Sequence, residues 1–144
     1  MGHMEYQRLL SLPEERVRHH LMGRLINELD FPANLLVKER AIHQLPHFTT
    51  DELQLNIPKD RRIDLLAYTW QDGLLKPLVL FEVKHHKPDH KAFSQILGYN
   101  HWIKSPFIAF VSDWHEGLFA YNKGRLESLG SLKSYKELCC FLNP

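Results

Sequence analysis

Two charged side chains stand at the end of an apolar segment, where they could do chemistry. The segment contains Leu78 and Leu80 and ends in Glu82 and Lys84. Residues two apart on a strand project from the same face, so these four side chains should share one face and the charges should emerge where the strand leaves the core. If the preceding alternating segment pairs with this strand as a hairpin, Asp64 comes beside Glu82. The pattern then predicts two carboxylates and an ammonium group at one edge of a sheet.

Two neighbouring carboxylates repel each other, and a divalent cation relieves that repulsion. Mg²⁺ favours carboxylate oxygens and keeps waters and phosphate oxygens as its other ligands, and Mn²⁺ is a possible substitute. A phosphodiester could complete the shell, with the cation polarising the phosphate and Lys84 orienting the attacking water or stabilising the developing negative charge. The expected reaction class is phosphodiester hydrolysis.

The elements that must position these groups follow from hydrophobic periodicity and turn residues. We expect a helix from about Leu12 to Leu29 with a capping box at Ser11-Leu12-Pro13-Glu14, and a turn at Asp72-Gly73. The other expected elements are β structure at 35–42, strands at 61–70, 77–84 and 106–112, a helix at 88–104, a hairpin of 118–121 with 125–129, and a helix at 134–142. This order predicts an α/β fold with a central mixed β-sheet flanked by α-helices on both faces.

Length and composition set the limits of this interpretation. With 144 residues the chain fits one domain, which we place at 5–144, because Met1-Gly2-His3-Met4 resembles the remnant of an expression tag. The apolar runs are too short to cross a bilayer and no leader opens the chain, so we expect a cytoplasmic protein without a membrane partner. The net charge of +1 means that contact with phosphates must come from a local basic patch.

The motifs resemble those of the PD-(D/E)XK nuclease superfamily, and in particular the type I restriction enzyme R protein N-terminal domain family. The resemblance extends from Pro13 to Ser112. Its motifs are Pro13-Glu14-Glu15-Arg16-Val17-Arg18, Arg61-Arg62-Ile63-Asp64, Phe81-Glu82-Val83-Lys84, and Phe93-Ser94-Gln95 with Tyr99-Asn100. It implies a restriction-endonuclease-like fold and a metal-dependent nuclease site built from a first-helix glutamate, Asp64, Glu82 and Lys84, with Gln95 and Tyr99 beside it.

The chain departs from the family pattern in two respects. Ile63 stands where the fullest motif has a proline before the aspartate. The R protein also drives cleavage with an ATP-dependent motor, and nothing in this sequence binds ATP. We therefore expect DNA as a partner and a separate motor or specificity subunit. A homodimer is a further possibility, since cutting two strands needs two sites.

The first-helix carboxylate has two candidates. Glu14 would be the third residue of the capping box, so we choose Glu15 as the catalytic and metal-binding residue. The alternative for Glu15 is a solvated surface glutamate with Arg18 or His19 one turn on.

Four side chains are candidates for nucleic-acid binding. They are Gln95 and Tyr99, one helical turn apart, and His85 and Lys87 in a basic loop beside the site. The alternatives are boundary residues of a helix and a solvated loop. The tryptophans at 70, 102 and 114 we interpret as core or interface aromatics rather than base-stacking platforms. Adjacent histidines point in different directions, which argues against a zinc site.

Three functions follow from these residues. The first is a Mg²⁺-dependent deoxyribonuclease of restriction or repair type that lacks its own motor. The second is a nucleic-acid-binding or assembly module that keeps the fold but does not cut. In the third, Asp64, Glu82 and Lys84 are a buried ion-pair network with a structural role only.

Overall fold

The computed structural model describes residues 12–48, 57 and 59–143, so residues 1–4 and Ser11 lie outside the described ranges. Its helices are α2 (Pro13–Asn27), α4 (His90–Ile103) and α5 (Tyr135–Leu142), with short 3₁₀ turns at Ala33–Leu35 and Ile42–Gln44. Its strands are β1 (Leu36–Lys38), β2 (Leu65–Gln71), β3 (Leu74–Val83), β4 (Phe107–Val111), β5 (Glu116–Asn122) and β6 (Arg125–Gly130). No helix within the described ranges is long and apolar enough to span a membrane.

The strands form one mixed sheet in the order β1-β2-β3-β4-β5-β6. Among the described strands only β3 and β4 pair in parallel, and α4 is the crossover between them, as the sequence predicted. The predicted hairpin of β2 and β3 is confirmed. Its turn residues Asp72 and Gly73 have φ of 54° and 75°, the left-handed conformation that a two-residue hairpin turn favours. The predicted α/β architecture with a mixed sheet is therefore confirmed.

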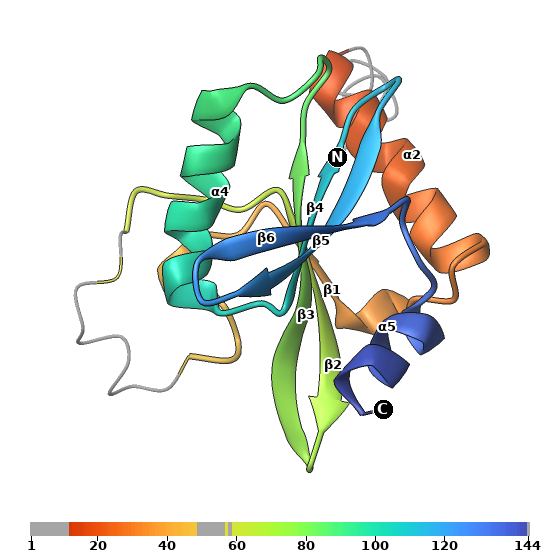
Figure 1. The fold of residues 1–144 in the computed structure, drawn as a ribbon, viewed down its shortest axis with the longest axis vertical. Helices are drawn as coiled ribbons and strands as arrows, with labels where there is room; N and C mark the ends of the chain where they lie inside the picture. The colour runs from red at the N-terminus through yellow and green to blue at the C-terminus, as the bar shows by residue number, and fades with distance from the viewer. Residues whose placement is uncertain (1–11, 49–56, 58, 144) are drawn as a thin grey trace, which may run out of the picture.

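Helices cover both faces of the sheet (Figure 1). On one face α2 contributes Val17, Leu21 and Leu25 to a buried cluster, and Leu138 of α5 joins it. On the other face α4 contributes the three buried residues Ala92, Ile96 and Ile103 to a second cluster. Each helix presents one apolar stripe to the sheet, which is why the 3.6-residue periodicity of the sequence located them.

Two expected β segments are shorter in the structure. Of 35–42 only Leu36–Lys38 is a strand, and it lies between the two 3₁₀ turns. The strand predicted from Arg61 begins at Leu65. The residues before it make isolated backbone hydrogen bonds instead of a continuous ladder; for example, Ile63 N donates to Arg40 O at 2.9 Å.

A bulge changes the predicted face of Leu78. The register of β2 and β3 shifts between Ala67 and Tyr68, so that Ala67 pairs with Val79 but Tyr68 pairs with Pro77. Leu78 has no partner in this ladder, and the strict two-residue alternation stops there. Leu80 lies in the α4-side cluster, whereas Leu78 joins the opposite cluster with Phe81. The prediction that Leu78 and Leu80 share a face is therefore wrong.

The predicted start of the first helix also needs correction. Leu12 is the N-cap residue of α2, its side chain makes no capping bond, and Pro13 occupies the first helical turn. A proline at this position needs no cap for its missing N–H group. The N-cap of α2 is therefore Leu12 and not the predicted Ser11, which lies outside the described residues.

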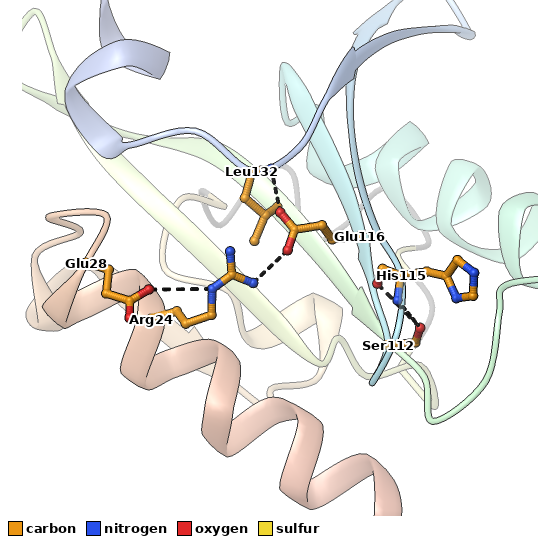
Figure 2. Close-up of polar contacts among 6 residues, drawn as sticks. All are labelled: Arg24, Glu28, Ser112, His115, Glu116 and Leu132. Atoms are coloured by element: carbon orange, nitrogen blue, oxygen red, sulfur yellow. Dashed lines mark hydrogen bonds and ion pairs between the residues drawn. The ribbon is translucent and has the colours of Figure 1, made fainter.

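An ion pair joins α2 to the β4–β5 end of the sheet, as Figure 2 shows. Arg24 donates to Glu116 at 2.7 Å, and the second oxygen of Glu116 accepts from Leu132 N at 2.9 Å. Glu28 lies farther from Arg24, at 3.8 Å. Burial alone would raise the pKa of Glu116, but the bonds from Arg24 and Leu132 outweigh it and lower the pKa.

Glu116→Gln should lower the free energy of unfolding by about 1–2 kcal/mol at pH 7, because the charge-assisted bond is lost. A carboxyl whose folded pKa is lowered stabilises the protein above its unfolded pKa, and that contribution disappears as the pH falls through the folded value. The free energies of unfolding of the variant and the wild type, measured in urea, should therefore converge as the pH falls below the lowered pKa of Glu116. Glu28→Gln is the matched control, expected to change stability by less than about 0.5 kcal/mol. An equal effect of both variants would contradict this assignment.

Candidate active site

The β2–β3 hairpin brings Asp64 and Glu82 together. Leu65 pairs with Phe81, and extending that antiparallel register by one residue places Asp64 opposite Glu82. The backbone N–H of Val83 donates to Asp64 Oδ2 at 2.8 Å, which fixes the aspartate against the end of β3. The predicted meeting of these two carboxylates is present in the structure.

Lys84 completes the group. Its Nζ lies 3.3 Å from Glu82 Oε1, and its backbone N–H donates to Val111 O at 2.9 Å, which holds the residue beside the end of β4. The Glu82 side chain is 7% exposed, whereas that of Lys84 is 24% exposed. Alternation from Leu80 places both side chains on the face of the sheet that α4 covers.

Burial and mutual repulsion raise the pKa of both carboxyl groups. For Glu82, burial and the nearby Asp64 charge raise the pKa to about 7, against the attraction of Lys84. For Asp64, burial raises the pKa more than the Val83 bond and the Lys84 charge lower it. Burial alone would lower the pKa of Lys84, but attraction to Glu82 and its neighbours outweighs it, so the ammonium form is favoured. The site therefore holds a protonated lysine beside two carboxyl groups that resist being charged together.

Glu14 adds negative charge to this group. It contributes to the raised pKa of Asp64, Glu82 and Lys84, and its Oε1 lies 3.7 Å from Nδ1 of His85. The start of α2 therefore lies at the same edge of the sheet as the hairpin carboxylates. The predicted capping box gave Glu14 a structural role, so its place beside this group was not expected from the sequence.

Glu15 has a different environment. Its carboxylate accepts a hydrogen bond from Arg18, and Arg18 also lies 2.8 Å from Glu39 Oε1. The Arg18 side chain is only 10% exposed, so these two carboxylates balance a cation that is nearly buried. Glu39 N also donates to Asp64 O at 3.0 Å, so the cluster ties α2 to the entry of β2. The Arg18 neighbour of the alternative is present, but the Glu15 side chain is only 27% exposed and is not a freely solvated surface group. Its role in catalysis or cation binding stays a prediction.

The proposed nucleic-acid contacts occupy two places. In α4, Gln95 Nε2 donates to Tyr99 Oη at 2.5 Å, and both side chains are partly exposed. In the loop after β3, His85 and Lys87 are exposed, and His85 faces Glu14. These four residues stay predictions as DNA contacts.

The donor set suits a hard cation that keeps most of its own waters. Asp64 and Glu82 supply carboxylate oxygens, and Mg²⁺ is commonly held by one or two carboxylates together with substrate phosphates. A cation would also relieve the repulsion that raises both pKa values. No group of three or more His, Cys, Asp or Glu side chains able to hold a metal ion occurs within the described ranges, so no closed cage of the zinc type is found there.

The comparisons with known proteins agree with the motifs. The family described as type I restriction enzyme R protein N terminus matches residues 13–132. The matched region contains α2, the whole sheet and α4. A search of curated proteins found no match.

Proposed function

Because the chain belongs to the type I restriction enzyme R protein N-terminus family, we propose that it acts on DNA within a restriction system and hydrolyses phosphodiester bonds with a divalent cation. The observation that carries the proposal is the pairing of a nearly buried Glu82 with Asp64 and Lys84 at the end of β3. The motifs that imply a restriction-endonuclease-like fold contain these same three residues.

In this proposal Asp64 and Glu82 hold Mg²⁺, or Mn²⁺ in its place. When bound there, the cation would polarise the scissile phosphate and favour deprotonation of the attacking water. The carboxylates fix its position, because Asp64 is anchored by Val83 N and Glu82 is buried in the sheet. The water oxygen would form a bond to phosphorus while the bond to the leaving oxygen breaks, with the proton of the attacking water passing to solvent and the leaving oxygen taking a proton from solvent.

Lys84 stabilises the charge that develops on the phosphate. Its raised pKa keeps the side chain protonated, so it acts as a donor and a positive charge rather than as a proton acceptor. Its partial exposure leaves the ammonium group accessible to a substrate. The substrate phosphate can then replace Glu82 as its partner once a cation engages the glutamate.

Glu14 is the first-helix carboxylate that we assign to this site. Its charge acts on all three hairpin groups, whereas Glu15 is occupied by Arg18. In this proposal the Glu14 carboxylate orients waters of the cation or a neighbouring ligand, and removing such an outer-sphere group typically costs about 10–100-fold in activity.

Glu14→Gln should therefore lower Mg²⁺-dependent cleavage by about 10–100-fold at unchanged stability. Glu15→Gln should leave the cleavage rate of the folded protein within about threefold, but should lower the free energy of unfolding by about 1–3 kcal/mol, because Arg18 loses a partner. Initial cleavage rates and thermal unfolding of the two variants check both parts. The reverse pattern of rates would make Glu15 the site residue, as the sequence predicted.

Cleavage of supercoiled plasmid and of single-stranded DNA with Mg²⁺ or Mn²⁺ tests the proposed function, with EDTA as the control. Cation-dependent cutting supports it. Retention of DNA by a folded protein that never cuts would instead support the non-cleaving binding or assembly module. Adding the motor and specificity subunits of a restriction system distinguishes a domain that is active alone from one that needs partners.

A further inference from the structure

A groove runs along the exposed side of α4, the helix that covers the face of the sheet toward which Glu82 projects. Its volume is about 700 Å³, and it is lined by Lys91, Ser94, Gln95, Gly98, Tyr99 and Trp102 of the helix and by Arg61 across from it. The helical residues lie three or four positions apart, so they share one face of α4. Arg61 lies three residues before Asp64, and Glu82 projects toward the same side of the sheet, so groove and site share one face of the protein.

The charge of this groove is of one sign. Its lining residues include two cations, Arg61 and Lys91, and no carboxylate. Both side chains are exposed, and no ion pair within the described ranges engages either of them. In a chain whose net charge is only +1, such a groove is a local patch that suits a polyanion.

Trp102 and Tyr99 give the groove aromatic walls. Trp102 packs partly against the α4-side core cluster and also lines the groove, so its ring is held in place while part of it stays accessible. Tyr99 is positioned by its bond from Gln95. This packing agrees with the interpretation of Trp102 as a core or interface aromatic, and the accessible part of its ring faces the groove. Rigid aromatic side chains beside cations are the means by which proteins bind unpaired bases.

Gly98 keeps the middle of the groove open. A Cβ atom at this position would meet no atom within 4 Å, so close packing does not require glycine there. Glycine inside a helix is unfavourable compared with residues that carry a side chain. A glycine that packing does not explain, at the floor of a cationic groove, leaves room for a ligand to approach the helix.

We propose that this groove binds a single-stranded stretch of DNA, with a base stacked on Trp102 and phosphates beside Lys91 and Arg61. The inference rests on the proposed function, because it names the form of the substrate that reaches the same site. An unpaired strand exposes the faces of its bases to an aromatic wall, whereas in a duplex those faces are stacked on one another.

Binding measured without cleavage tests the groove apart from the chemistry. The probe is a fluorescein-labelled 12-nucleotide dT strand, and a labelled 12-base-pair duplex is the comparison. The Kd of each is measured by fluorescence anisotropy, once in EDTA and once in Ca²⁺ in place of Mg²⁺. Trp102→Leu keeps an apolar side chain but removes the aromatic face, and should weaken single-strand binding by about five- to 150-fold. Lys91→Gln should reduce the slope of log K against log salt by about 0.7. Trp70→Leu on β2 and Lys136→Gln, the second residue of α5 as Lys91 is of α4, should leave both quantities unchanged.

Gly98→Leu separates binding from folding. Leucine is a better helix former than glycine, so the variant should keep or raise Tm, but its side chain fills the groove and should weaken single-strand binding at least about tenfold. Gly23→Leu in α2, where a Cβ also meets no atom within 4 Å, is the matched control and should not affect binding.

The outcomes separate this inference from the proposed function. If single-strand binding survives Trp102→Leu and Gly98→Leu, or if the protein prefers the duplex, the proposal that this groove binds a single strand is overturned, even if Mg²⁺-dependent cleavage is observed. Weakened binding in both variants supports the groove even if the wild-type protein never cleaves DNA.

Discussion

Lys84→Ala is expected to lower the rate of Mg²⁺-dependent DNA cleavage by about 10²–10³-fold in a protein that remains folded. The ammonium group lies 3.3 Å from Glu82 and is the positive charge placed to stabilise the developing phosphate charge. Removing one such preorganised donor commonly costs a factor of this size. Asp64→Asn should have an effect at least as large, since it removes a proposed ligand of the cation.

The matched control for this prediction is Lys87→Ala. Lys87 belongs to the same basic loop but is exposed, so its loss should weaken DNA binding slightly and leave the cleavage rate of bound DNA within a few-fold. Single-turnover rates at saturating DNA measure the cleavage step. Assays of DNA binding in Ca²⁺ measure affinity separately. Full activity in Lys84→Ala would exclude the assigned site.

Glu82→Gln is expected to stabilise the cation-free protein at pH 8 by about 1–3 kcal/mol and to abolish stabilisation by Mg²⁺. Burial and Asp64 raise the pKa of Glu82 to about 7, so ionising it destabilises the fold. A carboxyl with a raised folded pKa loses stability as the pH rises from its unfolded pKa, about 4.3, to its folded value. The difference in free energy of unfolding between the variant and the wild type should therefore vanish near pH 4 and reach its full size by pH 8.

Mg²⁺ should reverse the order of the two proteins. A ligand at 1,000 times its Kd stabilises a protein by about 4.1 kcal/mol, which exceeds the advantage of the variant, and only the wild type keeps both carboxylates that hold the cation. Thermal unfolding at pH 8 with and without Mg²⁺ measures this, with Glu127→Gln on the exposed face of β6 as the control. If Glu82→Gln instead destabilises the cation-free protein and Mg²⁺ has no effect on the wild type, the ion-pair network is structural only.

The hairpin itself was predictable because its turn signal is local in sequence. The turn at Asp72-Gly73 pairs Gln71 with Leu74, and that register alone would set Asp64 opposite Phe81. The bulge between Ala67 and Tyr68 shifts the register by one residue and so places Asp64 opposite Glu82. The change from apolar to charged residues at Glu82 marks the point where β3 leaves the core. The parallel crossover through α4 followed from the same kind of pattern.

Other parts depended on single-residue details or on distant contacts. The choice between Glu14 and Glu15 depended on which residue caps α2, and helix boundaries are uncertain by one or two residues from sequence alone. The flipped face of Leu78 follows from a bulge directly after Pro77. A proline inside a strand is a signal of a bulge, but the sequence prediction placed Pro77 at the start of the strand, where no bulge is needed. The groove along α4 depends on Arg61, which is thirty residues or more from the helical residues that it faces.

The two outer strands of the sheet bear on how copies of the protein can associate. Within the described residues β1 is only three residues long, and β6 carries the exposed Arg125 and Glu127. The register of β5 and β6 also shifts between Leu118 and Phe119. Short strands, charges and bulges at an edge all oppose the addition of a foreign strand, so neither border favours aggregation or strand exchange. Self-association of this protein would therefore use contacts between side chains rather than backbone pairing at the two edge strands.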